Sequence, residues 1–447
     1  MKTGADPERA RAASLRVLRA LRIAGHETYF AGGCVRDLLL GTMPSDFDVA
    51  TAARPEEVEA LFERTEPVGR QFGVILVIED GWPVEVATFR TEGAYTDGRR
   101  PDDVTYTRDP TEDVQRRDFT INGLLLDPDT DEVRDRVGGR EDIEARRIRA
   151  IGDPTRRFAE DRLRMLRAVR FAAVLDFEIE AGTASAIEAQ AEQIAAVSGE
   201  RIRDELLRML VTRGAARGVR LMHDLGLLGV LLPEVQAMAG VPQPEEYHPE
   251  GDVLEHTLQT LAALETPSPA LALGALLHDL GKPQTFEVRD RIRFHGHDRR
   301  GAELAEQVVA RLKLSRAEAG RVVTLVREHM RIADAPMMRR STLRRLLAEP
   351  HFEELLLLHR ADCLASHGRL DCYEFCRRAQ AELDQEPAMP PPLLRGGDLI
   401  ALGLAPGPLF GEILRQLQDA RLEGAVSTRE QALDWVRANY FDQLPKS

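Results

Sequence analysis

The spacing of hydrophobic residues divides the chain into a mixed N-terminal part and a helical remainder. Within residues 1–140, the short apolar runs 74–78 and 84–89 predict strands, whereas residues 1–26 have the spacing of a helix. From about residue 141 onward the apolar positions follow helical spacing. The pattern therefore predicts an α+β fold, in which a small mixed-sheet head is followed by all-helical segments.

Breaks in this pattern predict four domains. Residues 238–252 contain three prolines and two glycines, and 387–392 read PAMPPP, which cannot continue a helix. We expect a head, a helical neck, a second helical domain and a helical tail, which occupy residues 1–140, 141–237, 238–382 and 383–447.

Composition and charge narrow the classes of protein that the chain can represent. The 447 residues include 60 Lys and Arg against 74 Asp and Glu, a net charge of −14, so a nucleic acid would have to bind at a local basic surface. The four cysteines form no CxxC pair, which favours reduced thiols. No apolar run reaches the roughly 18 residues that cross a bilayer, and the N-terminus has no signal-peptide core. We therefore expect a cytoplasmic protein without a membrane partner. The sequence does not predict its oligomeric state.

A strand, a glycine turn and a short helix follow one another near the N-terminus. Residues 28–31 have the pattern of a strand, Gly32 and Gly33 that of a tight turn, and 35–40 that of a helix. Glycine lets the backbone approach a phosphate, and Arg36 adds a forked donor for its oxygens. By itself, the double glycine fits a structural turn better than a phosphate site.

Acidic and apolar residues alternate directly after this turn. Asp46 and Asp48 flank Phe47, so in a strand both carboxylates project from one face. Adjacent like charges are costly unless a cation lies between them, and carboxylate oxygens suit Mg²⁺. Glu85, in a second alternating run, offers a third carboxylate. The alternative is a solvated acidic strand edge.

Six motifs lie in order between residues 27 and 175. They are Gly32-Gly33-Cys34-Val35-Arg36-Asp37, Ser45-Asp46-Phe47-Asp48, Thr88-Phe89-Arg90-Thr91, Asp97-Gly98-Arg99-Arg100-Pro101, Arg116-Arg117-Asp118-Phe119-Thr120-Ile121-Asn122 and Glu160-Asp161-Arg162-Leu163-Arg164. Together they resemble the class II tRNA nucleotidyltransferase and poly(A) polymerase family of the polymerase-β superfamily. The resemblance implies a polymerase-β-like head in which Asp46 and Asp48 bind catalytic Mg²⁺, with Glu85 as third catalytic carboxylate. It implies nucleotide contacts from Gly32, Gly33, Arg36, Asp37, Arg90, Arg117, Asp118, Asn122, Asp161, Arg164, Arg167 and Arg170.

Asp161 and Arg164 carry a separate chemical argument. They are three residues apart on a helix predicted to begin near Pro154, and so share a face. Cytosine and adenine present an amino donor beside an unprotonated ring nitrogen, which complements an acceptor-only Asp beside a donor-only Arg. Guanine and uracil present a carbonyl beside a ring N–H, which does not complement this pair. In isolation the pair fits a helix-bracing ion pair better, but in the family this helix reads the incoming base.

The resemblance implies template-independent addition of C, C and A to the tRNA 3′ end from CTP and ATP. The terminal 3′-hydroxyl would attack the α-phosphate, with two metals assisting and pyrophosphate leaving. Family members that add only CC tend to lack a loop comparable to residues 91–101, so its presence favours addition of the terminal A. The alternatives are A-only addition, poly(A) synthesis and, from a different class, an HD phosphohydrolase with a nucleotide-binding head.

A second set of candidate ligands lies in the 238–382 domain. His256, the pair His278-Asp279, and Asp362 occur in an order that resembles the HD phosphohydrolase superfamily. Imidazoles and carboxylates from separate helices would bind a divalent metal whose identity the sequence does not give. His295, His297 and His329 fit a second metal position and ordinary polar histidines equally well. Whether this domain is catalytic stays open.

Arginines cluster at two places after the head, and each cluster fits either an RNA backbone or an ordinary solvated helix face. One cluster comprises Arg201, Arg203, Arg208, Arg213, Arg217 and Arg220, and the other comprises Arg339, Arg340, Arg344 and Arg345. In the tail, residues 394–414 predict a helix, a turn and a second helix.

Overall fold

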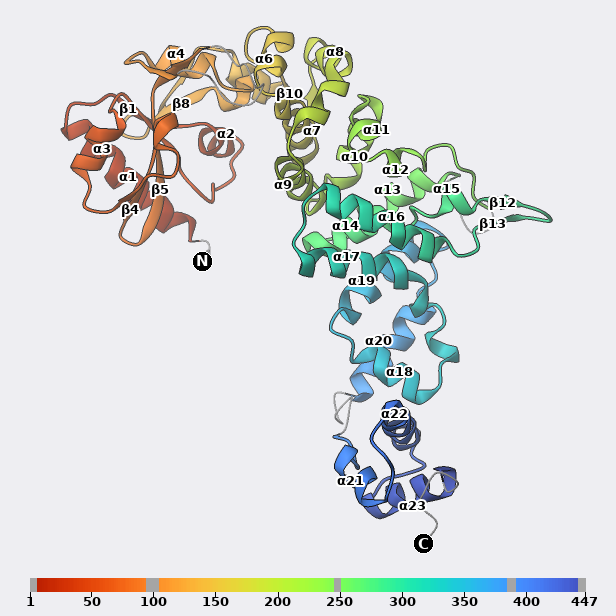
Figure 1. Ribbon diagram of the computed structural model, residues 1–447. Helices are drawn as coiled ribbons and strands as arrows, with labels where there is room; N and C mark the ends of the chain where they lie inside the picture. The colour runs from red at the N-terminus through yellow and green to blue at the C-terminus, as the bar shows by residue number, and fades with distance from the viewer. Residues whose placement is uncertain (1–5, 94–103, 245–250, 384–390, 441–447) are drawn as a thin grey trace. The chain divides into compact units, whose positions relative to one another are not determined.

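The computed structural model describes residues 6–93, 104–244, 251–383 and 391–440 (Figure 1). Its internal contacts divide the chain into two compact units. The N-terminal unit comprises Met1–Gln236 with Arg311–Lys313, and the C-terminal unit comprises Ala237–Ala310 with Leu314–Ser447.

A seven-stranded mixed sheet forms the head, as the hydrophobic pattern predicts. Its strand order is β3-β4-β5-β2-β1-β8-β9, and the neighbours are antiparallel except for β2 and β5, which run parallel. A separate antiparallel pair, β6 and β7, follows β5. The strands are β1 (Thr28–Ala31), β2 (Val49–Thr51), β3 (Thr65–Glu66), β4 (Val74–Glu79), β5 (Trp82–Thr88), β6 (Arg90–Glu92), β7 (Val104–Tyr106), β8 (Leu124–Asp127) and β9 (Glu132–Asp135).

The β4–β5 hairpin shows how the sequence produces this sheet. Asp80 and Gly81 both have positive φ, +49° and +80°, as a two-residue hairpin turn requires. Alternate residues of both strands are buried, and helix α1 (Pro7–Ile23) packs against them. Asp6 caps this helix by accepting a hydrogen bond from the backbone N–H of Arg9.

Helices make up most of the remainder of the N-terminal unit. They are α2 (Gly33–Leu39), α3 (Pro55–Leu61), α4 (Pro110–Gln115), α5 (Gly139–Glu144), α6 (Pro154–Glu160), α7 (Leu163–Leu175), α8 (Ala181–Gln190), α9 (Gly199–Leu210), α10 (Ala215–Asp224), α11 (Leu227–Leu231) and α12 (Pro233–Gln236). The neck also contains a parallel pair, β10 (Arg147–Ile148) with β11 (Glu178–Ile179), where an all-helical segment was expected. Strands of two residues are too short to show a period in the sequence.

The C-terminal unit is helical apart from one small hairpin. Its helices are α13 (Val253–Ala262), α14 (Pro269–Leu277), α15 (Lys282–Thr285), α16 (His297–Arg311), α17 (Arg316–Glu328), α18 (Arg340–Leu347), α19 (Phe352–Ala365), α20 (Asp371–Leu383), α21 (Gly396–Ala401), α22 (Pro408–Leu422) and α23 (Arg429–Tyr440). The hairpin pairs β12 (Glu287–Val288) with β13 (Ile292–Arg293). Helix α14 is apolar on all sides and lies in the core against α13, α17 and α19.

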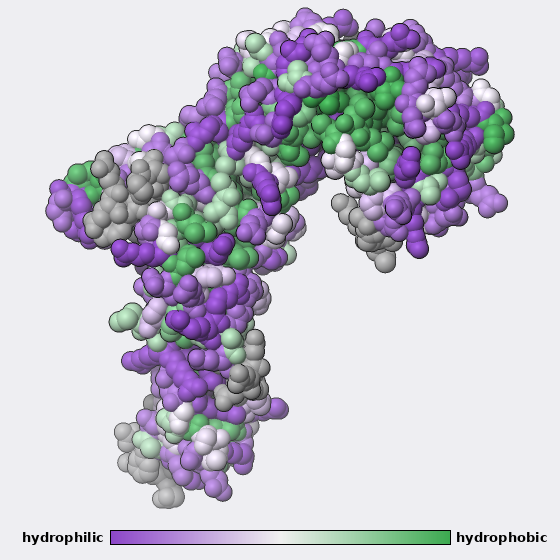
Figure 2. All heavy atoms as spheres, turned by 180° about the vertical axis from the view of Figure 1, so that it is seen from behind, coloured by the Kyte–Doolittle hydropathy of each residue, from purple (hydrophilic) through white to green (hydrophobic). Residues whose placement is uncertain are grey.

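The tail contains the predicted helix, turn and helix as α21 and α22. Together with α23, these helices form a small hydrophobic core within the tail. On the face shown in Figure 2, hydrophilic residues predominate and apolar residues gather in several places. In the part of the chain that the structure describes, no helix is both long enough and apolar enough to cross a membrane.

A candidate nucleotide pocket and a candidate metal centre

A pocket of about 640 Å³ in the N-terminal unit collects nearly all the residues predicted for the head site. Of that predicted set, only Asp37 does not line it. The lining comes from the sheet, from α2 and from α7, and includes Gly32, Gly33, Arg36, Asp46, Asp48, Glu85, Arg90, Arg117, Asp118, Asn122, Asp161, Arg164, Arg167 and Arg170. The sequence motifs therefore converge on one cavity.

Asp46 and Asp48 lie immediately before strand β2, and not within a strand as predicted. The predicted alternation nevertheless holds, because Phe47 and Val49 are buried while both aspartates are exposed. The backbone carbonyl oxygen of Asp48 accepts a hydrogen bond from the N–H of Ala31 on β1 at 3.0 Å, so the pairing of the two strands continues to this residue. Both carboxylates consequently face the pocket.

Glu85 lies beside these aspartates because of the sheet register. Strands β2 and β5 run parallel with Val49 opposite Val86, so the preceding residues, Asp48 and Glu85, are neighbours on the same face. The third carboxylate predicted from the sequence thus borders the same pocket.

The three carboxylates repel one another. Asp48 is open to solvent through the pocket, but the surrounding protein atoms remove part of its hydration. This desolvation, together with Glu85 and Asp46, raises the pKa of Asp48 to about 7, and desolvation and Asp46 raise the pKa of Glu85. Oxygen ligands that destabilise each other's charge suit a hard divalent cation such as Mg²⁺. Among the described residues, the groups of three ligands within 4.8 Å of one another all lie elsewhere, so these acids are more widely spaced than those groups.

The glycine turn at the start of α2 lets the backbone of Gly32 lie close to the side chain of Arg117. Gly32 has φ +76°, and a Cβ there would lie 3.1 Å from Nη1 of Arg117. Arg36, on the same helix, donates to Asn122 at 2.8 Å and to Asp37 at 2.7 Å. Asp37 therefore holds Arg36 in place and does not itself border the pocket.

Phe171 gathers positive charge on one wall. The guanidinium carbons of Arg36, Arg167 and Arg170 lie 5.2, 5.3 and 4.1 Å from its ring centroid. Cation–π contacts offset part of the repulsion between three adjacent cations. The result is a wall suited to an anion with several oxygens, such as a triphosphate.

Asp118 connects the head to α7. Its Oδ2 accepts from Arg167 at 2.5 Å, and its Oδ1 accepts from Asn122 at 3.1 Å and from the backbone N–H of Phe119 at 2.8 Å. Although burial opposes ionisation, Arg167 and these hydrogen bonds lower the pKa of Asp118 to about 2. Asp118 thus fixes neighbouring groups that line the pocket.

Asp113, which holds two arginines of the pocket in place, was not predicted from the sequence. Its buried carboxylate pairs with Arg116 at 2.6 Å and with Arg117 at 3.0 Å, and also accepts from the backbone N–H of Arg90. The available signal was its position three and four residues before the two arginines.

The helix predicted to begin near Pro154 is broken at Asp161. Helix α6 ends at Glu160, Asp161 has the extended angles φ −141° and ψ 106°, and α7 begins at Leu163. Asp161 accepts from the backbone N–H of Leu163 at 3.1 Å, which competes with continued helix. Asp161 and Arg164 both line the pocket, but not as two positions of one continuous helix.

Asp161 and Arg164 are each held by other groups. Arg201 from α9 pairs with both oxygens of Asp161, at 3.2 and 2.7 Å. Arg164 donates to Glu160 at 2.8 Å and to the backbone carbonyl oxygens of Arg157 and Arg116, both at 3.1 Å. The two predicted base-reading side chains are therefore fixed separately.

The first arginine cluster does not act as one surface. Arg201 and Arg208 line the nucleotide pocket, whereas Arg217 pairs with Asp176 and Glu178. The predicted loop over residues 91–101 lies mostly outside the described residues.

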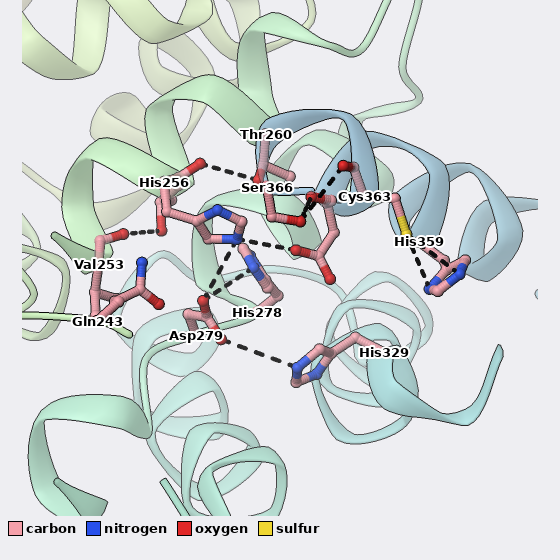
Figure 3. Close-up of polar contacts among 12 residues, drawn as sticks. Gln243, Val253, His256, Thr260, His278, Asp279, His329, His359, Cys363 and Ser366 are labelled. Carbon is pink, nitrogen blue, oxygen red and sulfur yellow. Dashed lines mark hydrogen bonds and ion pairs between the residues drawn. The ribbon is translucent and has the colours of Figure 1, made fainter. Parts of the chain in front are cut away.

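In the C-terminal unit, the predicted ligands converge from separate helices (Figure 3). His256 lies on α13, His278 and Asp279 follow α14, and Asp362 lies on α19. Nε2 of His256 lies 2.9 Å from Asp362 and 3.8 Å from Asp279, and Nε2 of His278 lies 3.2 Å from Asp279. The predicted His, His-Asp, Asp set is thus one cluster.

Two of the three additional histidines join this cluster. His297 and His329, at the starts of α16 and of the 3₁₀ turn after α17, group with Asp279 within 4.8 Å. His256, His278 and Asp362 form a second such group. His295 belongs to neither group, although it lines the adjacent pocket of about 500 Å³.

The histidine hydrogen bonds indicate which ring nitrogens face the centre. Nδ1 of His278, His297 and His329 each lies 2.7–2.8 Å from the carbonyl oxygen three residues earlier. Nδ1 is therefore the protonated nitrogen of each neutral ring, and Nε2 carries a lone pair. Two such nitrogens, on His297 and His329, lie 3.1 Å apart, and the buried Nε2 of His278 forms no hydrogen bond with any residue that the structure describes. Lone pairs directed at one another fit a bound cation.

Neighbouring side chains stabilise the ionised form of Asp279. Burial opposes its ionisation, but His278 and Lys282 lower the pKa of Asp279 well below its usual range. Nζ of Lys282 lies 2.7 Å from its carboxylate. Gly281 allows the close packing here, because a Cβ on it would lie 2.0 Å from the carbonyl oxygen of His297.

Three family models match successive parts of the chain. The poly(A) polymerase head domain matches residues 28–149, the probable RNA and SrmB-binding site of polymerase A matches 176–238, and the HD domain matches 253–366.

Curated relatives and solved structures agree with these matches. The chain is 36% identical over 440 residues to an A-adding tRNA nucleotidyltransferase of Deinococcus radiodurans, covering 93% of this chain and 96% of the relative. It is 44% identical over 265 residues to a CCA-adding enzyme of Bacillus pumilus, covering 59% of this chain and 62% of that enzyme. The structure of a Bacillus stearothermophilus CCA-adding enzyme in complex with CTP is similar, with TM-score 0.76, 29% identity, and 98% and 99% of the two chains covered.

Proposed function

Because this chain belongs to the tRNA nucleotidyltransferase family, we propose that it builds the complete CCA end of tRNA from CTP and ATP. The observation that carries the proposal is a single pocket containing Asp46 and Asp48, an arginine wall around Phe171, and the pair Asp161 and Arg164. These groups match a nucleotide's metal-bound phosphates, its triphosphate oxygens and its base edge.

We propose that the incoming triphosphate lies along the arginine wall. Arg36, Arg167 and Arg170 present forked donors that suit phosphate oxygens. Asp37 and Asp118 hold two of these arginines, so little side-chain entropy is lost when the phosphate binds. Mg²⁺ held by Asp46, Asp48 and Glu85 would supply charge stabilisation at the transferred phosphate and the leaving pyrophosphate.

Base selection in this proposal rests on the remaining hydrogen-bond capacity of Arg164 and Asp161. Arg164 has five N–H groups, and its three hydrogen bonds to described residues leave two that a ligand could use. Those donors can meet an unprotonated ring nitrogen, while Asp161 accepts from the neighbouring amino group. Cytosine and adenine satisfy both contacts, whereas uracil and guanine leave like groups facing each other.

A-only addition is the second candidate, because the relative that covers 93% of the chain is an A-adding enzyme. Two tRNA substrates separate the candidates, one lacking CCA and one ending in CC, each incubated with labelled CTP or ATP. We expect CTP to extend the first tRNA by two residues, after which ATP adds the terminal A. ATP should add the terminal A to the second tRNA directly. Absence of CTP incorporation with retained ATP addition to the CC end would establish A-only activity. Long A tails would indicate a poly(A) polymerase.

We further propose that the C-terminal centre binds divalent metal and hydrolyses phosphate esters. The converging Nε2 atoms of His278, His297 and His329 support metal binding, and Asp279 borders both groups. The adjacent pocket carries Lys282, Arg291 and Arg293, which suit a phosphate group. In this proposal the metal would activate water for hydrolysis.

The four-part division into head, neck, HD domain and tail remains part of this proposal. So do a cytoplasmic location and binding of the tRNA 3′ end. In the second arginine cluster, Arg344 is buried and Arg345 pairs with Asp419, whereas Arg339 and Arg340 are exposed and remain available to RNA in this proposal.

A further inference from the structure

Arg201 lies in the nucleotide pocket, although its sequence position suggested only an RNA-binding cluster. Its guanidinium contacts both oxygens of Asp161, and the two side chains are 24% and 16% exposed. We propose that Arg201 is a positioning residue that sets base selectivity by fixing the orientation of the Asp161 carboxylate. This inference rests on the proposed role of Asp161 as a base reader.

The backbone around Asp161 explains why its side chain needs support. Asp161 lies in the extended break between α6 and α7, so its side chain does not project from a regular helix. Among the described residues, Asp161 accepts hydrogen bonds from Arg201 and from the backbone N–H of Leu163. The planar fork of an arginine holds a carboxylate in one plane, which a single hydrogen bond does not achieve.

Helix α9 supplies this support from one face. Arg201 and Glu205 are four residues apart, so they lie side by side on the helix. Glu205 is buried and pairs with Arg170 at 2.5 Å, and it lies 3.6 Å from Arg167. The same face of α9 therefore secures both the proposed base reader and two arginines of the phosphate wall.

The remaining acceptor capacity of Asp161 fits one amino group. A carboxylate has about four acceptor positions. Arg201 occupies one on each oxygen, and Leu163 occupies another. A base amino group can take the position that is left, whereas the carbonyl oxygen of guanine or uracil would face a fixed, acceptor-only carboxylate. Without Arg201 the carboxylate could turn away, and the penalty against the wrong base would fall.

The test is single-nucleotide addition to tRNA ending in CC, because both candidate functions include this step. Values of kcat and KM are measured for ATP and GTP with wild type, Arg201→Ala, Arg201→Lys and the control Arg16→Ala. Arg16 is also an ion-paired arginine of the N-terminal unit, but it contacts Glu79 and Asp80 and does not line the pocket. We expect Arg201→Ala to lower the ratio of kcat/KM for ATP over GTP by at least about tenfold, chiefly through a raised KM for ATP. Arg201→Lys keeps the charge without the fork and should give an intermediate ratio, while Arg16→Ala should match wild type.

A purely structural role for Arg201 would lower ATP and GTP addition equally and leave the ratio unchanged, which would overturn the inference. If Arg201→Ala does not fold, the lysine variant decides, since an unaltered ratio in that variant overturns it as well. Failure of the wild type to add ATP would instead count against the proposed function.

Discussion

Replacement of Asp48 by Asn is expected to reduce nucleotidyl transfer by at least about 10³-fold while the protein stays folded. Asn keeps the size of the side chain but removes the charge that would bind a cation beside Asp46 and Glu85. The loss should appear in kcat for ATP addition to tRNA ending in CC. Asp129→Asn, which changes an exposed aspartate of the head outside the pocket, should retain wild-type activity.

The same substitution should alter stability in a pH-dependent way. Because desolvation and two neighbouring carboxylates raise the pKa of Asp48 to about 7, the folded protein binds this proton more tightly than the unfolded chain. The free energy of unfolding contributed by this group therefore falls as pH rises from about 4 to about 7. As the pH rises from about 5 to about 8, the free energy of unfolding should therefore fall less in Asp48→Asn than in wild type. Mg²⁺ should raise the melting temperature of wild type more than that of the variant. Unchanged activity, or equal responses to Mg²⁺, would remove Asp48 from the metal site.

Replacement of Asp279 by Ala is expected to abolish metal binding at the C-terminal centre and to leave tRNA extension intact. Asp279 contacts both histidine groups, so its loss weakens both metal positions. We expect wild type to bind up to two divalent ions there and to hydrolyse a phosphomonoester or cyclic phosphate after loading with Mn²⁺. The variant should lose at least about 100-fold of that hydrolysis.

Metal content is measured after chelation and reloading, beside a control, His223→Ala, whose side chain contacts Gln236 in the N-terminal unit. Metal content in Asp279→Ala equal to that of wild type would contradict the assigned ligands. Full metal loading without hydrolysis of any tested ester would restrict the centre to a structural role. Loss of tRNA extension in a folded variant would show that the two sites do not act independently.

Local patterns predicted the parts of the nucleotide site that depend on local geometry. The strand, glycine turn and short helix at residues 28–39, and the alternation around Asp46 and Asp48, follow from the periods of regular structure. Glu85 could be assigned from its own alternating run, because a parallel register then places it beside Asp48.

Tertiary packing determined the features that the sequence pattern did not contain. The break at Asp161 arises where its side chain accepts a hydrogen bond from the N–H of Leu163, and the apolar spacing continues across it. Arg201 reaches Asp161 only because α9 packs against α7, a contact between residues 40 positions apart. His295 and His297 lie two residues apart in one segment, and what distinguishes them is a tertiary contact, that of His297 with His329.

A crystal structure of the full chain with Mn²⁺ and a non-hydrolysable ATP analogue would test the proposal that Asp46 and Asp48 hold metal beside a base contacted by Asp161. We expect anomalous scattering from Mn²⁺ beside Asp46 and Asp48, phosphate oxygens on Arg36, and the adenine amino group at Asp161. Manganese bound away from both aspartates, or an adenine turned away from Asp161 and Arg164, would contradict it.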